Sequence, residues 1–127
     1  MKRLLIPLLA VLLLAACGSD GSADGASYEM ITPQEAKKIM DSRTGYVILD
    51  VRTQAEYDQG HIPGAVLIPD TQIKARAEAM LTDKAQLILV YCRSGRRSKL
   101  AAEILVDLGY TNIREFGGII DWPYEVE

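Results

Sequence analysis

The segment CRSGRRS, which runs from Cys92 to Ser98, holds the residues in this chain that are best suited to chemistry. It places a thiol directly after the apolar run 86–91 and beside the guanidinium groups of three arginines. Neighbouring cations and a helix N-terminus favour the thiolate, which is the nucleophilic form of cysteine. The segment therefore predicts a nucleophilic cysteine in a loop that attracts anions.

Gly95 lies in the middle of this loop, and a helical pattern follows from Ser98. A loop that curls at such a glycine turns its backbone N–H groups inward and forms an anion-binding nest at a helix N-terminus. Two plainer interpretations are a buried structural thiol at Cys92 and a solvated basic turn at the arginines. Three arginines and a helix start so close to the cysteine favour the reactive thiol.

Strand and helix patterns alternate along the chain and position this loop. Thr32, Pro33 and Glu35 form a capping box with proline at the first helical position, so a helix is predicted from Pro33. Apolar runs predict strands buried on both faces, with helical patterns between them: strands at 46–50, 65–69, 86–91 and, more weakly, 112–116, and helices at 73–81 and 98–108. This order predicts an α/β domain with a mainly parallel sheet, in which Cys92 follows the carboxyl end of a strand, where ligands bind.

Three separated motifs make residues 28–124 similar to the single-domain rhodaneses: LDVRTQAEYDQGHIPGAVLIP (49–69), CRSGRRS (92–98) and FGGIIDW (116–122). The resemblance implies an open, parallel, five-stranded sheet flanked by helices. It also implies a thiosulfate sulfurtransferase, which moves sulfane sulfur from thiosulfate or a similar donor to cyanide or a thiol. A protein thiol is a further candidate acceptor.

The resemblance also assigns roles to the residues of the loop. Cys92 would carry the transferred sulfur as a persulfide. The rest of the loop would bind the persulfide and the anionic donor through Arg93, Ser94, Gly95, Arg96 and Arg97.

Residues outside the loop receive supporting roles. Asp50 and Arg52 are interpreted as an ion pair that fixes the geometry of the site. His61 belongs to a structural turn, HIPGA, and receives no catalytic role. Gly117 and Gly118 would permit close approach of the backbone. For Trp122 two interpretations stay open, a wall of the pocket or a closure of the core.

The N-terminus has the layout of an export signal, because Lys2 and Arg3 precede an apolar stretch at 4–16 that is too short to span a membrane. The residues up to Cys17, Leu-Ala-Ala-Cys, resemble the lipobox of bacterial lipoproteins, which implies cleavage before that cysteine and its lipidation. An ordinary signal peptide with an incidental cysteine is the alternative. We expect a signal peptide at 1–16, a lipidated cysteine with a flexible tether at 17–27, and the folded domain at 28–127.

A lipidated Cys17 predicts an extracytoplasmic protein that is anchored to a membrane without spanning it. In a two-membrane bacterium this would be the outer membrane or the periplasmic face, because Gly18 stands where aspartate would indicate retention at the inner membrane. In a one-membrane bacterium it would be the outer face of the cell membrane.

Composition excludes several other classes of protein. Without Lys2 and Arg3, 12 basic side chains stand against 17 acidic ones, and a net charge of −5 argues against nucleic-acid binding. One histidine and two cysteines are too few for a zinc cluster, and no cofactor is expected.

Two other functions compete with sulfur transfer. A non-catalytic rhodanese-like module for binding or redox sensing is one, although the loop cysteine that inactive members usually lack is present as Cys92. A cysteine-based phosphatase or arsenate reductase is the other. That chemistry requires an arginine after five intervening residues, where this chain has Ser98.

Overall fold

A computed structural model of the chain describes residues 27–127. The predicted signal peptide, the predicted lipidation site Cys17 and residues 18–26 of the predicted tether lie outside the described residues. Within residues 27–127, none of the helices combines the length and the apolarity that a membrane span requires.

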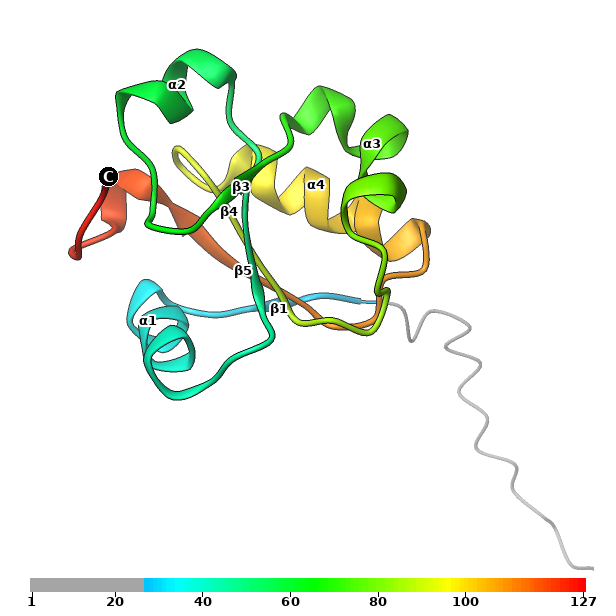
Figure 1. Cartoon of the computed structure of the whole chain (residues 1–127), viewed down its shortest axis with the longest axis horizontal. Coiled ribbons are helices and arrows are strands. Elements are labelled where there is room, and N and C mark those ends of the chain that lie inside the picture. The colour runs from blue at the N-terminus through cyan, green and yellow to red at the C-terminus, as the bar shows by residue number, and fades with distance from the viewer. Residues whose placement is uncertain (1–26) are drawn as a thin grey trace, which may run out of the picture.

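Strands and helices alternate along the described chain (Figure 1). The elements are β1 (Glu29–Met30), α1 (Pro33–Ser42), β2 (Val47–Asp50), α2 (Gln54–Gln59), β3 (Val66–Leu67), the 3₁₀ turn η1 (Asp70–Gln72), α3 (Ile73–Met80), β4 (Ile88–Cys92), α4 (Arg96–Asp107), β5 (Ile113–Gly118) and the 3₁₀ turn η2 (Ile119–Asp121).

The five strands form one sheet in the order β1-β5-β4-β2-β3, and every neighbouring pair is parallel. The predicted α/β fold with a parallel five-stranded sheet is therefore confirmed. β4, in which all five residues are buried, is the central strand. Because the strands are parallel, their carboxyl ends meet at one edge of the sheet, and Asp50, Cys92 and Gly118 end β2, β4 and β5 there.

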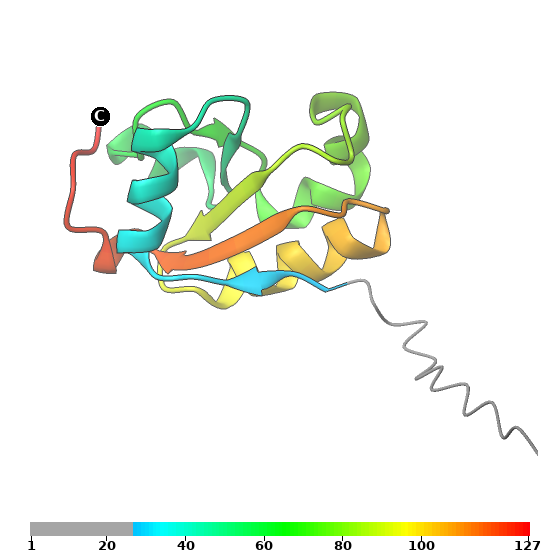
Figure 2. The same ribbon diagram turned by 90° about the horizontal axis from the view of Figure 1, so that it is seen from below.

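Helices cover both faces of the sheet, α1 on one face and α3 and α4 on the other (Figures 1 and 2). The core on the α3 and α4 side packs Ile73, Ala101 and Leu105 against the strands. The core on the α1 side is aromatic and contains Phe116 and Trp122 among its buried residues. Burial on both sides explains why the central strands read as nearly continuous apolar runs.

Helix α1 begins where its capping box predicts. Glu35 N donates to Thr32 Oγ1 at 3.0 Å, and Thr32 N donates to Glu35 Oε2 at 3.4 Å. The same device starts α2, where Glu56 N donates to Thr53 Oγ1 at 3.2 Å. The sequence pattern predicts no helix at 54–59, because α2 is short and none of its residues is buried.

Two predicted elements differ from those observed. The run 65–69 was expected to be a strand buried on both faces, but β3 has two residues, lies at the edge of the sheet and leaves Val66 exposed. The helix expected from Ser98 begins at Arg96, because Gly95 adopts a left-handed conformation with φ of 103° and turns the chain into α4. Arg96 and Arg97 therefore lie in the first turn of a helix rather than in a loop.

Candidate active site

Cys92 is the last residue of the central strand, and its thiol is 1% exposed. The register between β4 and β5 shifts between Val90 and Cys92, so that Cys92 lies opposite Gly118. The thiol is thus fixed at the carboxyl edge of the sheet, where the strand gives way to the turn 93–95 and then to α4. This is the position that the sequence predicts for a ligand site.

Two groups at the start of α4 lie within hydrogen-bonding distance of the sulfur. The backbone N–H of Gly95 donates to Cys92 Sγ at 2.9 Å, and Ser98 Oγ lies 3.3 Å from the same atom. Gly95 reaches this position because its left-handed backbone directs the N–H inward, a conformation that costs glycine little. A backbone donor at a helix N-terminus stabilises a negative charge on sulfur.

A buried carboxylate, that of Glu115, completes the polar surroundings of the thiol. Glu115 lies in β5, is 2% exposed, and accepts hydrogen bonds at its Oε1 atom from Ser98 Oγ at 2.7 Å and from Gly117 N at 2.7 Å. Ser98 itself is fully buried. Neither Ser98 nor Glu115 was among the predicted site residues. The alternation of β5 carries a signal for Glu115, because that glutamate shares a face with buried Ile113.

The three arginines of the segment lie in different environments. Arg93 and Arg96 are exposed, as is Ser94, which lies between them in the sequence. Arg97 is half-buried, and its guanidinium donates to both carboxylate oxygens of Glu56 at 2.7 and 2.9 Å. The Arg97 guanidinium is therefore bound to α2, whereas the other two are open to an approaching anion.

The glycine pair of the third motif packs directly against the turn that follows Cys92. A Cβ atom on Gly118 would lie 1.9 Å from the carbonyl oxygen of Arg93, far inside contact distance. The same carbonyl oxygen accepts a hydrogen bond from Ile120 N at 3.2 Å. The close approach that was predicted for this pair is thus observed at Gly118, and it anchors the backbone of the turn to the end of β5.

Asp50 and Arg52 form a buried ion pair at the carboxyl end of β2, with Arg52 Nη2 2.7 Å from Asp50 Oδ2. Tyr91 Oη donates to the same carboxylate oxygen at 2.6 Å and accepts from Ile62 N at 3.1 Å. Burial and the hydrogen bond to Asp50 raise the pKa of Tyr91 above its ordinary value. Arg52 Nη2 also donates to the Gly60 carbonyl oxygen at 2.7 Å, so the pair ties β2 to the segment after α2.

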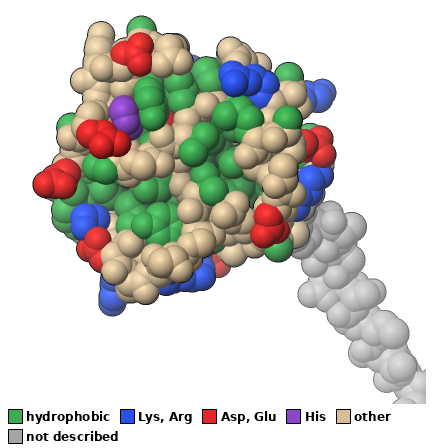
Figure 3. All heavy atoms as spheres, viewed as in Figure 1, with side chains coloured by type: hydrophobic (Ala, Val, Ile, Leu, Met, Phe, Trp, Pro, Cys, Tyr) green, Lys and Arg blue, Asp and Glu red, His purple; other side chains and the backbone are tan. Residues whose placement is uncertain are grey.

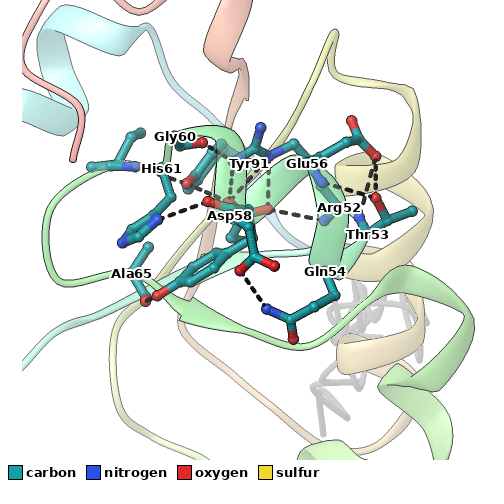
Figure 4. Close-up of polar contacts among 12 residues, drawn as sticks. Arg52, Thr53, Gln54, Glu56, Asp58, Gly60, His61, Ala65 and Tyr91 are labelled. Atoms are coloured by element: carbon teal, nitrogen blue, oxygen red, sulfur yellow. Dashed lines mark hydrogen bonds and ion pairs between the residues drawn. The ribbon is translucent and has the colours of Figure 1, made fainter.

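His61 packs within the turn that contains it. Its ring stacks on Tyr57 with centroids 3.7 Å apart, and its Nδ1 lies 3.0 Å from the Tyr57 carbonyl oxygen (Figure 4 shows the latter contact). The backbone groups of His61 pair with those of Glu127 at 2.9 and 2.8 Å. These contacts serve the turn and leave the imidazole apart from Cys92.

A pocket of about 400 Å³ opens beside the turn after Cys92. Its lining includes the charged residues Arg52, Glu56 and Arg93, together with Gln59 and Gly60, and a set of large apolar or aromatic side chains: Ile119, Ile120, Trp122, Tyr124 and Val126. Trp122 also lies in the aromatic core, 5.6 Å from Phe116 between ring centroids, so it both lines this pocket and closes the core. A second pocket of about 500 Å³ lies between α1 and the C-terminal segment, lined in part by Met40, Ile48 and Ile62.

The space-filling view adds the chemical character of one face of the molecule. In Figure 3, hydrophobic side chains gather toward the middle of that face, and charged side chains occupy mainly its margin. Among residues 27–127, no cluster of three histidine, cysteine or acidic side chains is arranged to hold a metal ion.

Residues 32–123 match the family described as the Rhodanese-like domain. Thiosulfate sulfurtransferase PspE of Escherichia coli is 41% identical over 73 residues, which cover 58% of this chain and 70% of PspE. Putative sulfur carrier protein YrkF of Bacillus subtilis is 34% identical over 111 residues. That match covers 87% of this chain but 59% of YrkF, so the chain spans less than two thirds of the latter.

A solved structure, described as rhodanese with anions from E. coli, superposes on this chain with a TM-score of 0.61 and 36% identity. The superposition covers 65% of this chain and 96% of the other. The family match includes the cysteine segment, the glycine pair and all the strands except β1. The chain therefore belongs to the rhodanese-like domain family.

Proposed function

We propose that this chain is a thiosulfate sulfurtransferase that carries sulfane sulfur as a persulfide on Cys92. The observation that carries the proposal is the position of the Cys92 sulfur, which accepts the Gly95 N–H at the N-terminus of α4 within a rhodanese-like fold. Relatives whose names state sulfurtransferase activity support the same reaction class.

The reaction proceeds in two displacements on sulfur. The Cys92 thiolate attacks the outer sulfur of thiosulfate, a new S–S bond forms, and the S–S bond of the donor breaks as sulfite leaves with the electron pair. Cyanide or an acceptor thiolate then attacks the outer sulfur of the persulfide, and the Cys92 thiolate leaves. Splitting the transfer in this way replaces one difficult step with two easier ones.

The donor is an anion, and in this proposal the exposed guanidiniums of Arg93 and Arg96 bind it. Hydrogen bonds to charged groups contribute about 1.5 to 3 kcal/mol each, so two such contacts account for useful donor affinity. Arg97 contributes its positive charge to the site while its hydrogen bonds go to Glu56. The pocket beside Arg93 offers space for the acceptor.

Two other functions compete with sulfur transfer. A non-catalytic binding or redox-sensing module would take up no sulfur, so the mass measurement described below separates it from a sulfurtransferase. A phosphatase requires an arginine to clamp the oxyanion from the far end of its loop. In this chain that position is Ser98, whose hydroxyl contacts Glu115.

We further propose that the protein acts outside the cytoplasm, held at a membrane by lipid on Cys17. The lipobox-like residues 14–17 support this proposal, together with the small, polar residues that follow them. A domain tethered in this way would meet small sulfur donors at the membrane surface.

Mass measurement of the intact protein tests the sulfur-transfer proposal. The full chain carrying Cys17→Ser, in which Cys92 is the single cysteine, is incubated with thiosulfate and weighed before and after addition of cyanide. We expect the mass of one sulfur atom to be gained and then removed by cyanide, and we expect Cys92→Ser to abolish the gain. If thiosulfate and other sulfane-sulfur donors all fail to add sulfur, the chain is not a sulfurtransferase of this kind.

A further inference from the structure

Glu115 is a buried acid next to a site that must bind an anion, and the sulfur-transfer reaction described above gives it no role. Its Oε1 atom lies 2.7 Å from Ser98 Oγ, and Ser98 Oγ lies 3.3 Å from Cys92 Sγ. The three side chains therefore form a continuous polar path from β4, through the first turn of α4, to β5. A permanent negative charge at the end of this path would oppose both the thiolate and the donor.

The Ser98 hydroxyl has a single proton and four acceptors within reach. They are Glu115 Oε1 at 2.7 Å, the Gly95 carbonyl oxygen at 3.1 Å, Cys92 Sγ at 3.3 Å and the Gly117 carbonyl oxygen at 3.4 Å. The shortest contact is also the one to a carboxylate, and hydrogen bonds to ionised acceptors are the strongest. With its proton directed at Glu115, the hydroxyl presents a lone pair to the sulfur and accepts the S–H proton.

We propose that Glu115 is a positioning residue that shares one proton with Cys92 through the Ser98 hydroxyl. The S–H proton of Cys92 moves to Ser98 Oγ while the Ser98 proton moves to Glu115 Oε1. The products are a thiolate, an intact hydroxyl and a neutral carboxylic acid. No proton leaves for solvent, and the net charge of the buried site does not change. The proposal rests on the proposed function, in which Cys92 carries the sulfur, and it explains how the reactive thiolate of Cys92 forms.

Sharing the proton reduces the repulsion between the Glu115 carboxylate, the Cys92 thiolate and the anionic donor. When Glu115 holds the proton, the anionic donor meets one buried negative charge rather than two. Other titratable or charged groups contribute to the same field: Arg97 of α4 interacts with Cys92, Glu56 of α2 is paired with Arg97, and Tyr28, before β1, interacts with Glu115. The exposed Arg93 and Arg96 flank the turn in the sequence. The cations stabilise the thiolate form, and Ser98 connects it to the carboxylate.

The pH profile of Cys92 alkylation by iodoacetamide tests this proposal without a sulfur donor. The full chain carrying Cys17→Ser, purified in detergent, leaves Cys92 as the single thiol. We expect two rises separated by a plateau, because the thiol and the carboxylic acid lose their protons as a coupled pair. In Glu115→Gln the plateau disappears and a single rise remains, because the second member of the coupled pair is absent.

Matched variants separate this role from a structural one. Glu29→Gln makes the same change at an exposed glutamate on the neighbouring strand β1 and is expected to retain the two-step profile. Glu115→Asp keeps the carboxylate but shortens the side chain by one methylene, which moves the carboxylate away from Ser98 Oγ. This variant is expected to lose the plateau. Circular dichroism checks that each variant is folded.

A double-mutant cycle provides the second arm. Ser98→Ala removes one oxygen atom and interrupts the path while leaving the Glu115 carboxylate in place, so it is expected to lose the plateau, and in the Glu115→Gln background it is expected to remove no further step. Two-step alkylation in Glu115→Gln, or effects of the two changes that multiply, would overturn the proposal. Since iodoacetamide requires no sulfur transfer, a two-step profile in a chain that takes up no sulfur would reject the proposed activity and retain the shared proton.

Discussion

At the scale of single residues, the ion pair between Arg97 and Glu56 shows how neighbouring arginines acquire different tasks. Arg97 bridges α4 and α2 with two hydrogen bonds of 2.7 and 2.9 Å, while Arg93 and Arg96 stay exposed. Glu56 is fixed in turn by the capping box of α2. The ion pair therefore fixes the first turn of α4, which carries Ser98, relative to α2.

The Glu56 carboxylate predicts an acid-dependent loss of stability. The hydrogen bond from Arg97, partly opposed by burial, lowers the pKa of Glu56 to about 2 from an ordinary value of 4.5. A depressed pKa in the folded state stabilises the protein above pH 4.5, and this contribution is lost as the pH falls toward 2. Because both side chains are about a quarter exposed (26% and 27%), we expect a contribution of order 1 kcal/mol.

Thermal unfolding between pH 7 and pH 2 measures this effect. Glu56→Gln should melt at a lower temperature than the parent at pH 7 and should show a smaller decline across the acid window. Glu78→Gln is the control, since its partner Lys84 forms a more exposed pair, and it should follow the parent. An equal acid-dependent decline in Glu56→Gln and the parent would show that the ion pair does not contribute.

At the scale of elements, the contact between the end of β5 and the turn after Cys92 determines where the sulfur lies. Gly118 packs against the Arg93 carbonyl so closely that a methyl group has no room. The same carbonyl accepts the N–H of Ile120 from η2. The backbone of β5 and η2 thus packs against the turn and holds it in place. Main-chain contacts therefore help to position the Cys92 sulfur, in addition to the side-chain contacts.

Gly118→Ala is expected to displace the turn and to slow sulfur transfer by about 100-fold, because misplacement of a reactive group by about 1 Å costs that much. Gly64→Ala is the matched control. It places alanine at φ of 80° in a position with no atoms within 4 Å, so it strains the backbone without touching the site. Both variants should melt earlier than the parent, and only Gly118→Ala should lose transfer rate. Equal rates of sulfur transfer in the two variants would show that the contact between Gly118 and the turn is not required.

Elements with strong local signals were predictable from the sequence, and elements made by packing were not. Thr32, Pro33 and Glu35 act within one turn of chain, and α1 begins as they predict. β1 has only two residues, both exposed, and becomes a strand by pairing with β5, so no apolar side-chain pattern marks it. The start of α4 was misplaced because the left-handed conformation of Gly95 is a property of the folded turn.

The candidate site divides in the same way. Cys92 and its arginines are contiguous in the sequence, and their types alone indicate the chemistry. The contact between Ser98 and Glu115 joins residues from α4 and β5, and it exists because that helix packs on that strand. Which of the three arginines would be bound to Glu56 was equally hidden, since the helix that carries this glutamate has no buried residues to reveal it.

At the scale of the whole molecule, the described residues form one sheet with a core on each face, and the site lies at one edge of that sheet. The predicted anchor precedes this domain in the chain. We therefore expect sulfur transfer and membrane attachment to depend on different cysteines, Cys92 and Cys17, so that a single substitution would separate the two.

Cell fractionation tests whether membrane attachment depends on Cys17 and not on Cys92. Cys17→Ser is expected to move the protein from the membrane pellet to the soluble fraction, because the lipid chains that give stable anchoring can no longer be attached. The control is the same substitution at the other cysteine, and Cys92→Ser should remain in the pellet. A pellet-bound Cys17→Ser protein would show that attachment does not depend on lipid.

The shortness of the two outer strands bears on whether copies of the protein associate through the edges of their sheets. β1 and β3 border the sheet with two residues each, so each border presents a very short row of backbone groups that another chain could pair with. Long, flat sheet borders are templates for edge-to-edge aggregation, and short ones are a way that natural proteins avoid it. The sheet is thus poorly suited to extension by a neighbour, and we expect the domain to resist polymerisation through its strands at high local concentration.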